Sequence, residues 1–251
     1  MSTFLTLAYL FFIGSLFGWV LELVFRRFFS RANPEHRWIN PGFCVGPYVP
    51  LYGCGLCILY LLAALGDATG WEDSAAGRAL LFLGMAVSMT AIEYVAGVLL
   101  LKLAKVRLWD YSMLWGNVDG LICPLFSLFW ALLGGAYYFF VHPHILDALN
   151  WLANNLAFSF VIGYFFGVFT IDVAYSFHLL ARLRQFAQEE EVVVKLENLK
   201  AHLHTARERA RLSQRFFFQL HTVRPLSEHL REALEALEQA HRSDANRRSH
   251  S

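Results

Sequence analysis

Three carboxylates lie within apolar stretches of the sequence, where a charged side chain is expensive. They are Glu22, Glu93 and Asp172. A charge at the centre of a bilayer costs at least about 2.5 kcal/mol, so a residue of this kind is usually kept for a partner, a ligand or a proton. Glu22 lies one helical turn before Arg26 and is therefore able to pair with it, whereas Glu93 and Asp172 lie deeper. These residues predict a polar site inside a membrane.

The composition defines the class of protein that holds this site. The chain of 251 residues is 57% hydrophobic and contains 23 Phe, and its mean hydropathy is +0.42. These values are too high for a soluble domain and indicate an integral membrane protein in contact with membrane lipids. A nucleic-acid partner is not expected, because the basic residues of the C-terminal region are interspersed with acidic ones and its aromatic residues lie in one cluster.

Five apolar stretches have the length of about 17–25 residues that a helix needs to cross a bilayer. They cover about residues 3–25, 43–66, 79–101, 121–141 and 156–180. We predict an all-α fold, a polytopic bundle of five transmembrane helices in residues 1–181, followed by a cytoplasmic helical tail in residues 182–251. Basic residues concentrate after the first, third and fifth stretches, which places the N-terminus outside and the C-terminus in the cytoplasm. The expected location is the inner cell membrane.

The tail has the pattern of an amphipathic helix. Apolar residues recur at heptad spacing from Leu196 to Leu220, which predicts a coiled-coil-like helix over about residues 183–220. Pro225 ends or kinks it, and a shorter helix follows over about residues 226–240. Two interpretations remain open: a solvated helical hairpin, or a surface for a homo-oligomer or a cytosolic partner.

Two loop-to-helix junctions on the predicted cytoplasmic side are rich in residues that interrupt helices. The first contains Pro41, Gly42, Gly46, Pro47, Pro50 and Gly53, and the second contains Gly120. Unwound backbone at membrane depth is tolerated where it is covered by protein or lines a cavity, and many transporters build ligand sites in this way. We therefore predict a cytoplasm-facing polar cavity, with the candidate lining residues Glu22, Glu93, Asp110, Asp119, Asp172, Asn40 and Asn117.

Several ordered motifs carry a family resemblance over about residues 10–145. They are Gly18-Trp19-x-x-Glu22, the stretch from Asn40 to Pro50, Glu93-Tyr94-x-x-Gly97, Trp109-Asp110-Tyr111-Ser112 and Asn117-x-x-Gly120. Together they resemble the putative ABC-transporter permease family of bacteria, type IV. The resemblance implies a transport component and a separate ATP-binding subunit, and it implies no particular substrate. Pro41 and Leu121 stand where this family usually has arginine, which predicts an altered or neutralised site.

Two other functions compete with transport. The chain could be a non-catalytic membrane anchor or regulator that acts through its tail, or an intramembrane lipid-processing enzyme with Glu93 and Asp110 as acid and base. No catalytic residue, cofactor or metal site is predicted, because the sequence has neither a Walker A motif nor a metal-ligand cluster. The four cysteines are interpreted as small packing residues.

Overall fold

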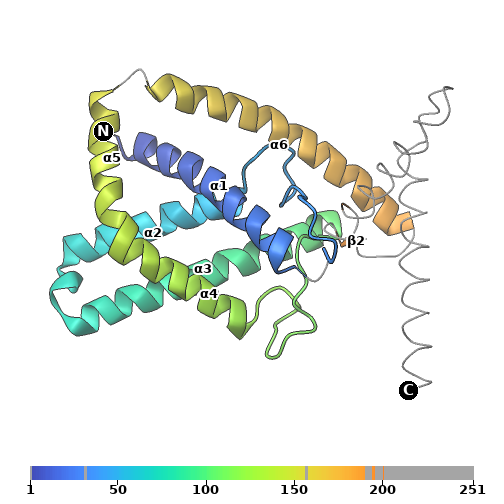
Figure 1. Cartoon of the computed structure of the whole chain (residues 1–251), viewed down its shortest axis with the longest axis horizontal. Coiled ribbons are helices and arrows are strands. Elements are labelled where there is room, and N and C mark those ends of the chain that lie inside the picture. The colour runs from blue at the N-terminus through green and yellow to red at the C-terminus, as the bar shows by residue number, and fades with distance from the viewer. Residues whose placement is uncertain (1, 31–32, 156–157, 190–193, 196–199, 201–251) are drawn as a thin grey trace.

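Helices make up most of the computed structural model, which describes residues 2–30, 33–155, 158–189, 194–195 and 200 (Figure 1). The elements in chain order are α1 (Thr3–Phe28), α2 (Pro50–Thr69), η1 (Trp71–Asp73), α3 (Ala75–Ala104), β1 (Val106–Arg107), α4 (Pro124–Ala136), η2 (Tyr137–Val141), α5 (His142–Asn154), α6 (Phe158–Glu189) and β2 (Val194–Lys195).

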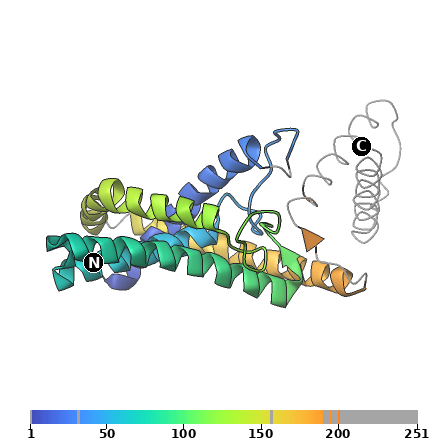
Figure 2. The ribbon, with the colours of Figure 1, turned by 90° about the horizontal axis from the view of Figure 1, so that it is seen from below.

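The five-helix prediction for the membrane region is confirmed. Among the described residues, 5 helices are long and apolar enough to cross a membrane: α1, α2, α3, the α4–η2–α5 segment from Pro124 to Leu152, and α6 from Phe158 to His178. Figure 2 shows α3, α4 and α6 running lengthwise along the bundle, with the C-terminal part of α1 angled away from them. The chain is an all-α, multi-pass membrane protein.

Two predicted boundaries need correction. The second helix begins at Pro50 and not near residue 43, because residues 41–49 form a loop in which Gly42 has a left-handed φ of 71°. The loop predicted after residue 141 is helical: α4 continues through the π-helical turn η2 into α5, which ends at Asn154. Pro143 lies in the first turn of α5, where its missing N–H is tolerated.

The beginning of the tail also differs from the predicted helix. α6 ends at Glu189, and β2 pairs in parallel with β1, so that Val194 is opposite Val106. A helix running unbroken from residue 183 to residue 220 is therefore wrong at residues 194–195. The rest of the heptad stretch, Pro225 and the second tail helix lie outside the described residues.

Close packing of α1 against α2 depends on glycine. A Cβ atom built on Gly18 would lie 2.2 Å from the Cβ and Cγ atoms of Tyr52, and one built on Gly14 would lie 2.9 Å from the Cβ atom of Leu56. On the other helix, a Cβ on Gly53 would lie 2.2 Å from the hydroxyl of Ser15. Small residues let membrane helices approach and gain van der Waals contact. This contact brings Tyr52 against the C-terminal half of α1.

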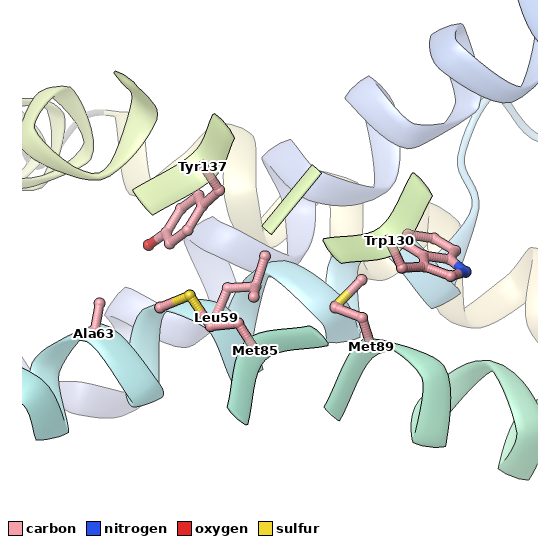
Figure 3. Close-up of a cluster of buried hydrophobic side chains, with 6 residues drawn as sticks. All are labelled: Leu59, Ala63, Met85, Met89, Trp130 and Tyr137. Carbon is pink, nitrogen blue, oxygen red and sulfur yellow. The ribbon is translucent and has the colours of Figure 1, made fainter. Parts of the chain in front are cut away.

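Two clusters of buried side chains join the remaining elements. The first unites α2, α3, α4 and η2 through Leu59, Ala63, Met85, Met89, Trp130 and Tyr137 (Figure 3). The second packs Cys44 and Tyr48, from the loop before α2, against Phe165 of α6. The loop before α2 is thus a packed part of the bundle and is fixed to α6.

Candidate functional site

A cavity of about 920 Å³ opens between α1, α2, α3, α4 and the C-terminal part of α6. Its walls are mainly apolar, and its polar side chains are Glu22, Arg26, Tyr52, Glu93, Trp109, Tyr111 and Trp130. Its lining residues come mainly from the second halves of α1 and α3 and the first parts of α2 and α4. Figure 1 shows that α1 and α3 finish at the end of the bundle where α2 and α4 begin. This is the end that the charge distribution predicts to face the cytoplasm.

Glu93 continues the buried face of α3. The stripe contains Leu81, Met85, Met89, Glu93 and Gly97, so a carboxylate occupies a position at which the preceding turns present apolar side chains. Glu93 is 2% exposed, and its Oε1 accepts a hydrogen bond of 3.0 Å from the Tyr111 hydroxyl. Its Oε2 is enclosed and has no hydrogen bond of normal geometry, although the Trp130 indole interacts with the carboxylate electrostatically. One oxygen of the Glu93 carboxylate therefore lacks a hydrogen bond of normal geometry.

Glu22, on the opposite wall, is surrounded by partners. Arg26 donates from Nε to Oε1 at 3.0 Å, and its second nitrogen, Nη2, lies 3.0 Å from the same oxygen. The Tyr52 hydroxyl donates to Oε2 at 3.0 Å. Because Arg26 follows Glu22 by one helical turn, α1 itself supplies the counter-charge. Glu22 and Glu93 thus line the same cavity, but only Glu22 has a basic side chain bound to it.

The loop after α3 places Tyr111 beside Glu93. The Tyr111 backbone N–H donates to the Gly120 carbonyl at 2.8 Å, and its ring stacks on Phe126 with 4.3 Å between ring centroids. Gly120 has a φ of 68°, which suits glycine. Burial, and next the charge of Glu93, raise the pKa of Tyr111 far above its usual value. Tyr111 therefore keeps its proton and acts as a donor.

Three predicted site residues belong to this loop and do not line the main cavity. Asp110 accepts from the Ser112 N–H at 3.1 Å and lies 3.6 Å from Arg107. Asn117 and Asp119 line a second, smaller hollow of about 540 Å³. Asn117 donates to the Leu114 carbonyl at 2.8 Å, and Asp119 accepts from Tyr94 at 2.8 Å. Glu93 lines the main cavity and Asp110 does not.

Asp172 serves the loop before α2. Its carboxylate accepts from the backbone N–H of Val45 at 3.1 Å and of Gly46 at 2.7 Å. It also accepts from the hydroxyl of Ser176 at 3.0 Å and from the hydroxyl of Tyr48. Asp172 is not among the residues that line the main cavity. The structure thus separates it from Glu22 and Glu93 and makes it a clamp between α6 and the loop.

Asn40 completes this clamped loop. It accepts from the Trp19 indole at 2.6 Å and donates to the carbonyls of Cys44 at 3.1 Å and Val45 at 2.9 Å. Burial, followed by the bond to Asp172, raises the pKa of Tyr48 above its usual value. Burial also raises the pKa of the Cys44 thiol to about 12. The loop before α2 is consequently held by polar bonds whose donors stay protonated.

The helix-interrupting residues have separate local roles. Pro41 is fully buried, while a Cβ on Gly46 would lie 2.5 Å from the ring of Tyr48. Pro47 precedes this ring, Pro50 opens α2, and Gly53 packs on α1. Leu121 is 2% exposed and faces Gly97. Pro41 and Leu121 therefore place apolar groups where the family resemblance implied arginine, and Arg26 is the cation in the cavity wall.

The sequence reasoning did not single out Tyr52, Tyr111 or Trp130. Tyr111 stood inside the motif Trp109-Asp110-Tyr111-Ser112, and Tyr52 comes two residues after the stretch from Asn40 to Pro50. A buried carboxylate requires donors, and a hydroxyl carried by an apolar ring is one that a membrane interior tolerates. That requirement is the signal that could have found both tyrosines. No group of three or more potential metal ligands occurs within the described part of the chain.

Comparison with protein families gives a match over most of the membrane region. A family model described as putative ABC-transporter type IV matches residues 9–177, a range that covers most of α1, all of α2 to α5 and the larger part of α6. A search of curated proteins and a search of solved structures each gave no match.

Proposed function

Because this chain belongs to the putative ABC-transporter type IV family, we propose that it is the membrane-embedded subunit of a transporter and holds its substrate in the cavity between α1, α2, α3 and α4. The observation that carries this proposal is the cavity of about 920 Å³ with a buried, incompletely bonded carboxylate, Glu93, in its wall. Cavities of about 300–1,000 Å³ are typical of small-molecule sites. The proposed orientation has the cavity in the cytoplasmic half of the membrane and the C-terminus in the cytoplasm.

The energy source would be a second chain. The sequence has no Walker A motif, so hydrolysis of ATP requires a separate subunit. The two loops between α1 and α2 and between α3 and α4 lie at the same end of the bundle and offer it a docking surface (Figure 1). Purification from the native membrane in a mild detergent, followed by mass spectrometry, should recover a nucleotide-binding subunit in stoichiometric amount. Its reproducible absence would contradict a two-subunit transporter.

A volume change in the cavity tests the binding role directly. Ala96 lines the cavity on α3, one turn beyond Glu93. The substitution Ala96→Phe should fill part of the space and reduce transport or growth that depends on the protein. Ala91→Phe is the matched control, because Ala91 is exposed on the same helix and does not line the cavity. Equal activity of the two variants would contradict a substrate site in this cavity.

A second candidate function is regulation or anchoring through the tail. Two observations favour it: β2 pairs with β1 in the loop after α3, and Lys200 donates to the carbonyls of Asn40 at 2.9 Å and Gly42 at 2.7 Å in the loop before α2. The chain beyond α6 thus contacts both loops. Removing residues 190–251 spares α6 and separates the two functions: a scaffold should lose all activity, and a transport subunit should retain part of it. Crosslinking of the purified chain would show whether the tail forms a homo-oligomer.

A further inference from the structure

We propose that the cavity binds an amphiphile whose cationic ammonium group sits against the carboxylate of Glu93 and whose apolar body lies along the cavity wall. This inference rests on the proposed function, since it names the substrate class for the same cavity. The argument combines the charges of the polar side chains, the chemistry of the walls and the volume.

The charges in the wall favour a cation. Among the cavity-lining residues the acidic and basic side chains are Glu22, Arg26 and Glu93. Arg26 holds Glu22 through contacts of 3.0 Å, so these two charges balance each other. Glu93 has no such basic neighbour in the cavity wall and accepts one hydrogen bond, at Oε1. A ligand that brings a positive charge would complete the compensation, because a buried charge is stable only when it is paired and hydrogen-bonded.

The neighbouring groups suit an ammonium group in particular. An ammonium carries three donors and no acceptor. Oε2 of Glu93 is enclosed and has no hydrogen bond of normal geometry. Trp130 also lines the cavity and interacts with the Glu93 carboxylate, so it keeps an aromatic side chain beside the proposed head-group position. An anionic head would instead be repelled by Glu93 and would find Arg26 already engaged with Glu22.

The remaining walls favour an apolar body. Apart from the polar side chains named above, the cavity is bordered largely by Leu, Phe, Val, Ile and Ala residues of α1, α3, α4 and α6. Its volume of about 920 Å³ lies near the upper end of the range of about 300–1,000 Å³ for small-molecule sites. A compact hydrophilic cation would leave most of this surface without contacts, whereas a long-chain amine would fill it.

Three matched probes test the head group. Each has an undecyl chain with a dansyl group at one end and an ammonium, a hydroxyl or a carboxylate at the other. Binding to the full chain in phosphatidylcholine nanodiscs is measured by energy transfer from tryptophan, since Trp109 and Trp130 line the cavity. The ammonium probe should bind about tenfold or more tightly than the hydroxyl probe, the difference expected for one charge-assisted hydrogen bond. Glu93→Gln should abolish this preference.

The controls separate the possible failures. Asp147→Asn removes one carboxylate at an exposed position of α5 and should leave the preference intact. Equal unfolding temperatures of wild type and Glu93→Gln establish that the variant is folded. If all three probes bind with equal affinity and Ala96→Phe weakens all three, the cavity binds substrates but the cationic head group is wrong. If no probe binds the wild type, both the inference and the binding role of the cavity fail.

The same ammonium chemistry could come from two sources. Adding phosphatidylethanolamine to the nanodiscs should displace the ammonium probe if the natural occupant is an aminolipid of the bilayer. Persistence of probe binding would identify a free amphiphilic amine as the source. A preference of the wild-type chain for the carboxylate probe, or unchanged ammonium binding by Glu93→Gln, would overturn the proposal.

Discussion

Asp172 and Glu93 are both carboxylates on the inner faces of membrane-spanning helices, yet their surroundings differ sharply. Asp172 accepts hydrogen bonds from two backbone N–H groups and two hydroxyls, of which three donors belong to the loop before α2. Glu93 accepts one, from Tyr111, and its second oxygen is enclosed in the wall of a cavity. Both oxygens of the Asp172 carboxylate accept hydrogen bonds from the protein, whereas one oxygen of the Glu93 carboxylate has no such bond of normal geometry.

The difference teaches that depth in the membrane does not define the role of a charged residue. The number of hydrogen-bond donors that surround the residue defines its role. A carboxylate with all of its acceptor positions filled from neighbouring elements stabilises their arrangement. A carboxylate kept partly unbonded costs stability, and such a cost is expected where a ligand completes the site. The predictions below are designed to test this contrast.

The largest effect is expected for Asp172→Ala. The substitution leaves the N–H groups of Val45 and Gly46 and the hydroxyls of Tyr48 and Ser176 without their acceptor. Each orphaned buried donor costs about 1–3 kcal/mol, and since water reaches part of this site we expect a total loss of about 2–4 kcal/mol in the free energy of unfolding. Thermal or denaturant unfolding in detergent measures it.

The reactivity of the Cys44 thiol provides a local measure of how the loop before α2 responds to the loss of Asp172. Cys44 is 1% exposed, and burial raises its pKa to about 12, so little thiolate exists at neutral pH. In a chain whose other three cysteines are replaced by Ser, Asp172→Ala should accelerate alkylation of Cys44, and Glu93→Gln should not. Equal rates in the two variants would remove the distinction between the clamp and the cavity wall.

A smaller effect is expected for glycine replacement at the contact between α1 and α2. Gly18→Ala places a Cβ 2.2 Å from the Cβ and Cγ atoms of Tyr52, which are close to the backbone and cannot swing aside. Overpacking of this kind costs about 1–3 kcal/mol and should also displace the Tyr52 hydroxyl from Glu22. Gly167→Ala on α6 is the matched control, because no atom lies within 4 Å of the added Cβ. Similar unfolding temperatures for the two variants would contradict the close approach of α1 and α2.

Much of this architecture was predictable from the sequence. Apolar length alone predicted five membrane helices, and the placement of Glu22, Glu93 and Asp172 within them was correct. The fourth segment was predicted to end at residue 141, because the apolar stretch ends there, whereas η2 joins α4 to α5 without a break. Heptad spacing likewise cannot anticipate that residues 194–195 pair with β1, because that pairing depends on a distant partner.

The candidate site was harder to predict, because hydrogen-bond partners are a property of the fold. Glu93 and Asp172 look alike along the chain, and nothing in the spacing says that Val45 and Gly46 lie against Asp172. The grouping of Asp172 with Glu22 and Glu93 in one cavity required the helices to be placed in space. Glycines such as Gly18 set that placement through interhelical contacts.

A pair of tyrosine substitutions sharpens the contrast further. Tyr111→Phe removes the one hydrogen bond that Glu93 accepts, whereas Tyr48→Phe leaves Asp172 with three other donors. A hydrogen bond to a charged group contributes about 1.5–3 kcal/mol. We expect Tyr111→Phe to lose about 1.5 kcal/mol of unfolding free energy and Tyr48→Phe to lose less, because the remaining donors still hold Asp172. If chemical unfolding shows a larger loss for Tyr48→Phe than for Tyr111→Phe, the number of donors does not determine the roles of Asp172 and Glu93.

The smallest effect at neutral pH concerns the protons of these tyrosines. Burial raises the pKa of both Tyr48 and Tyr111 above the usual value of about 10. In the unfolded chain these phenols ionise near pH 10, while in the folded chain they stay protonated, so their contribution to stability is constant below about pH 10 and declines as the pH rises further. Unfolding free energies measured from neutral to alkaline pH should therefore be flat and then fall. The fall should be shallower in Tyr48→Phe and in Tyr111→Phe, each of which has lost one such phenol. A decline that begins near neutral pH in the wild type and persists unchanged in both variants would assign the titration to other groups and would contradict the role of these hydroxyls as permanent donors.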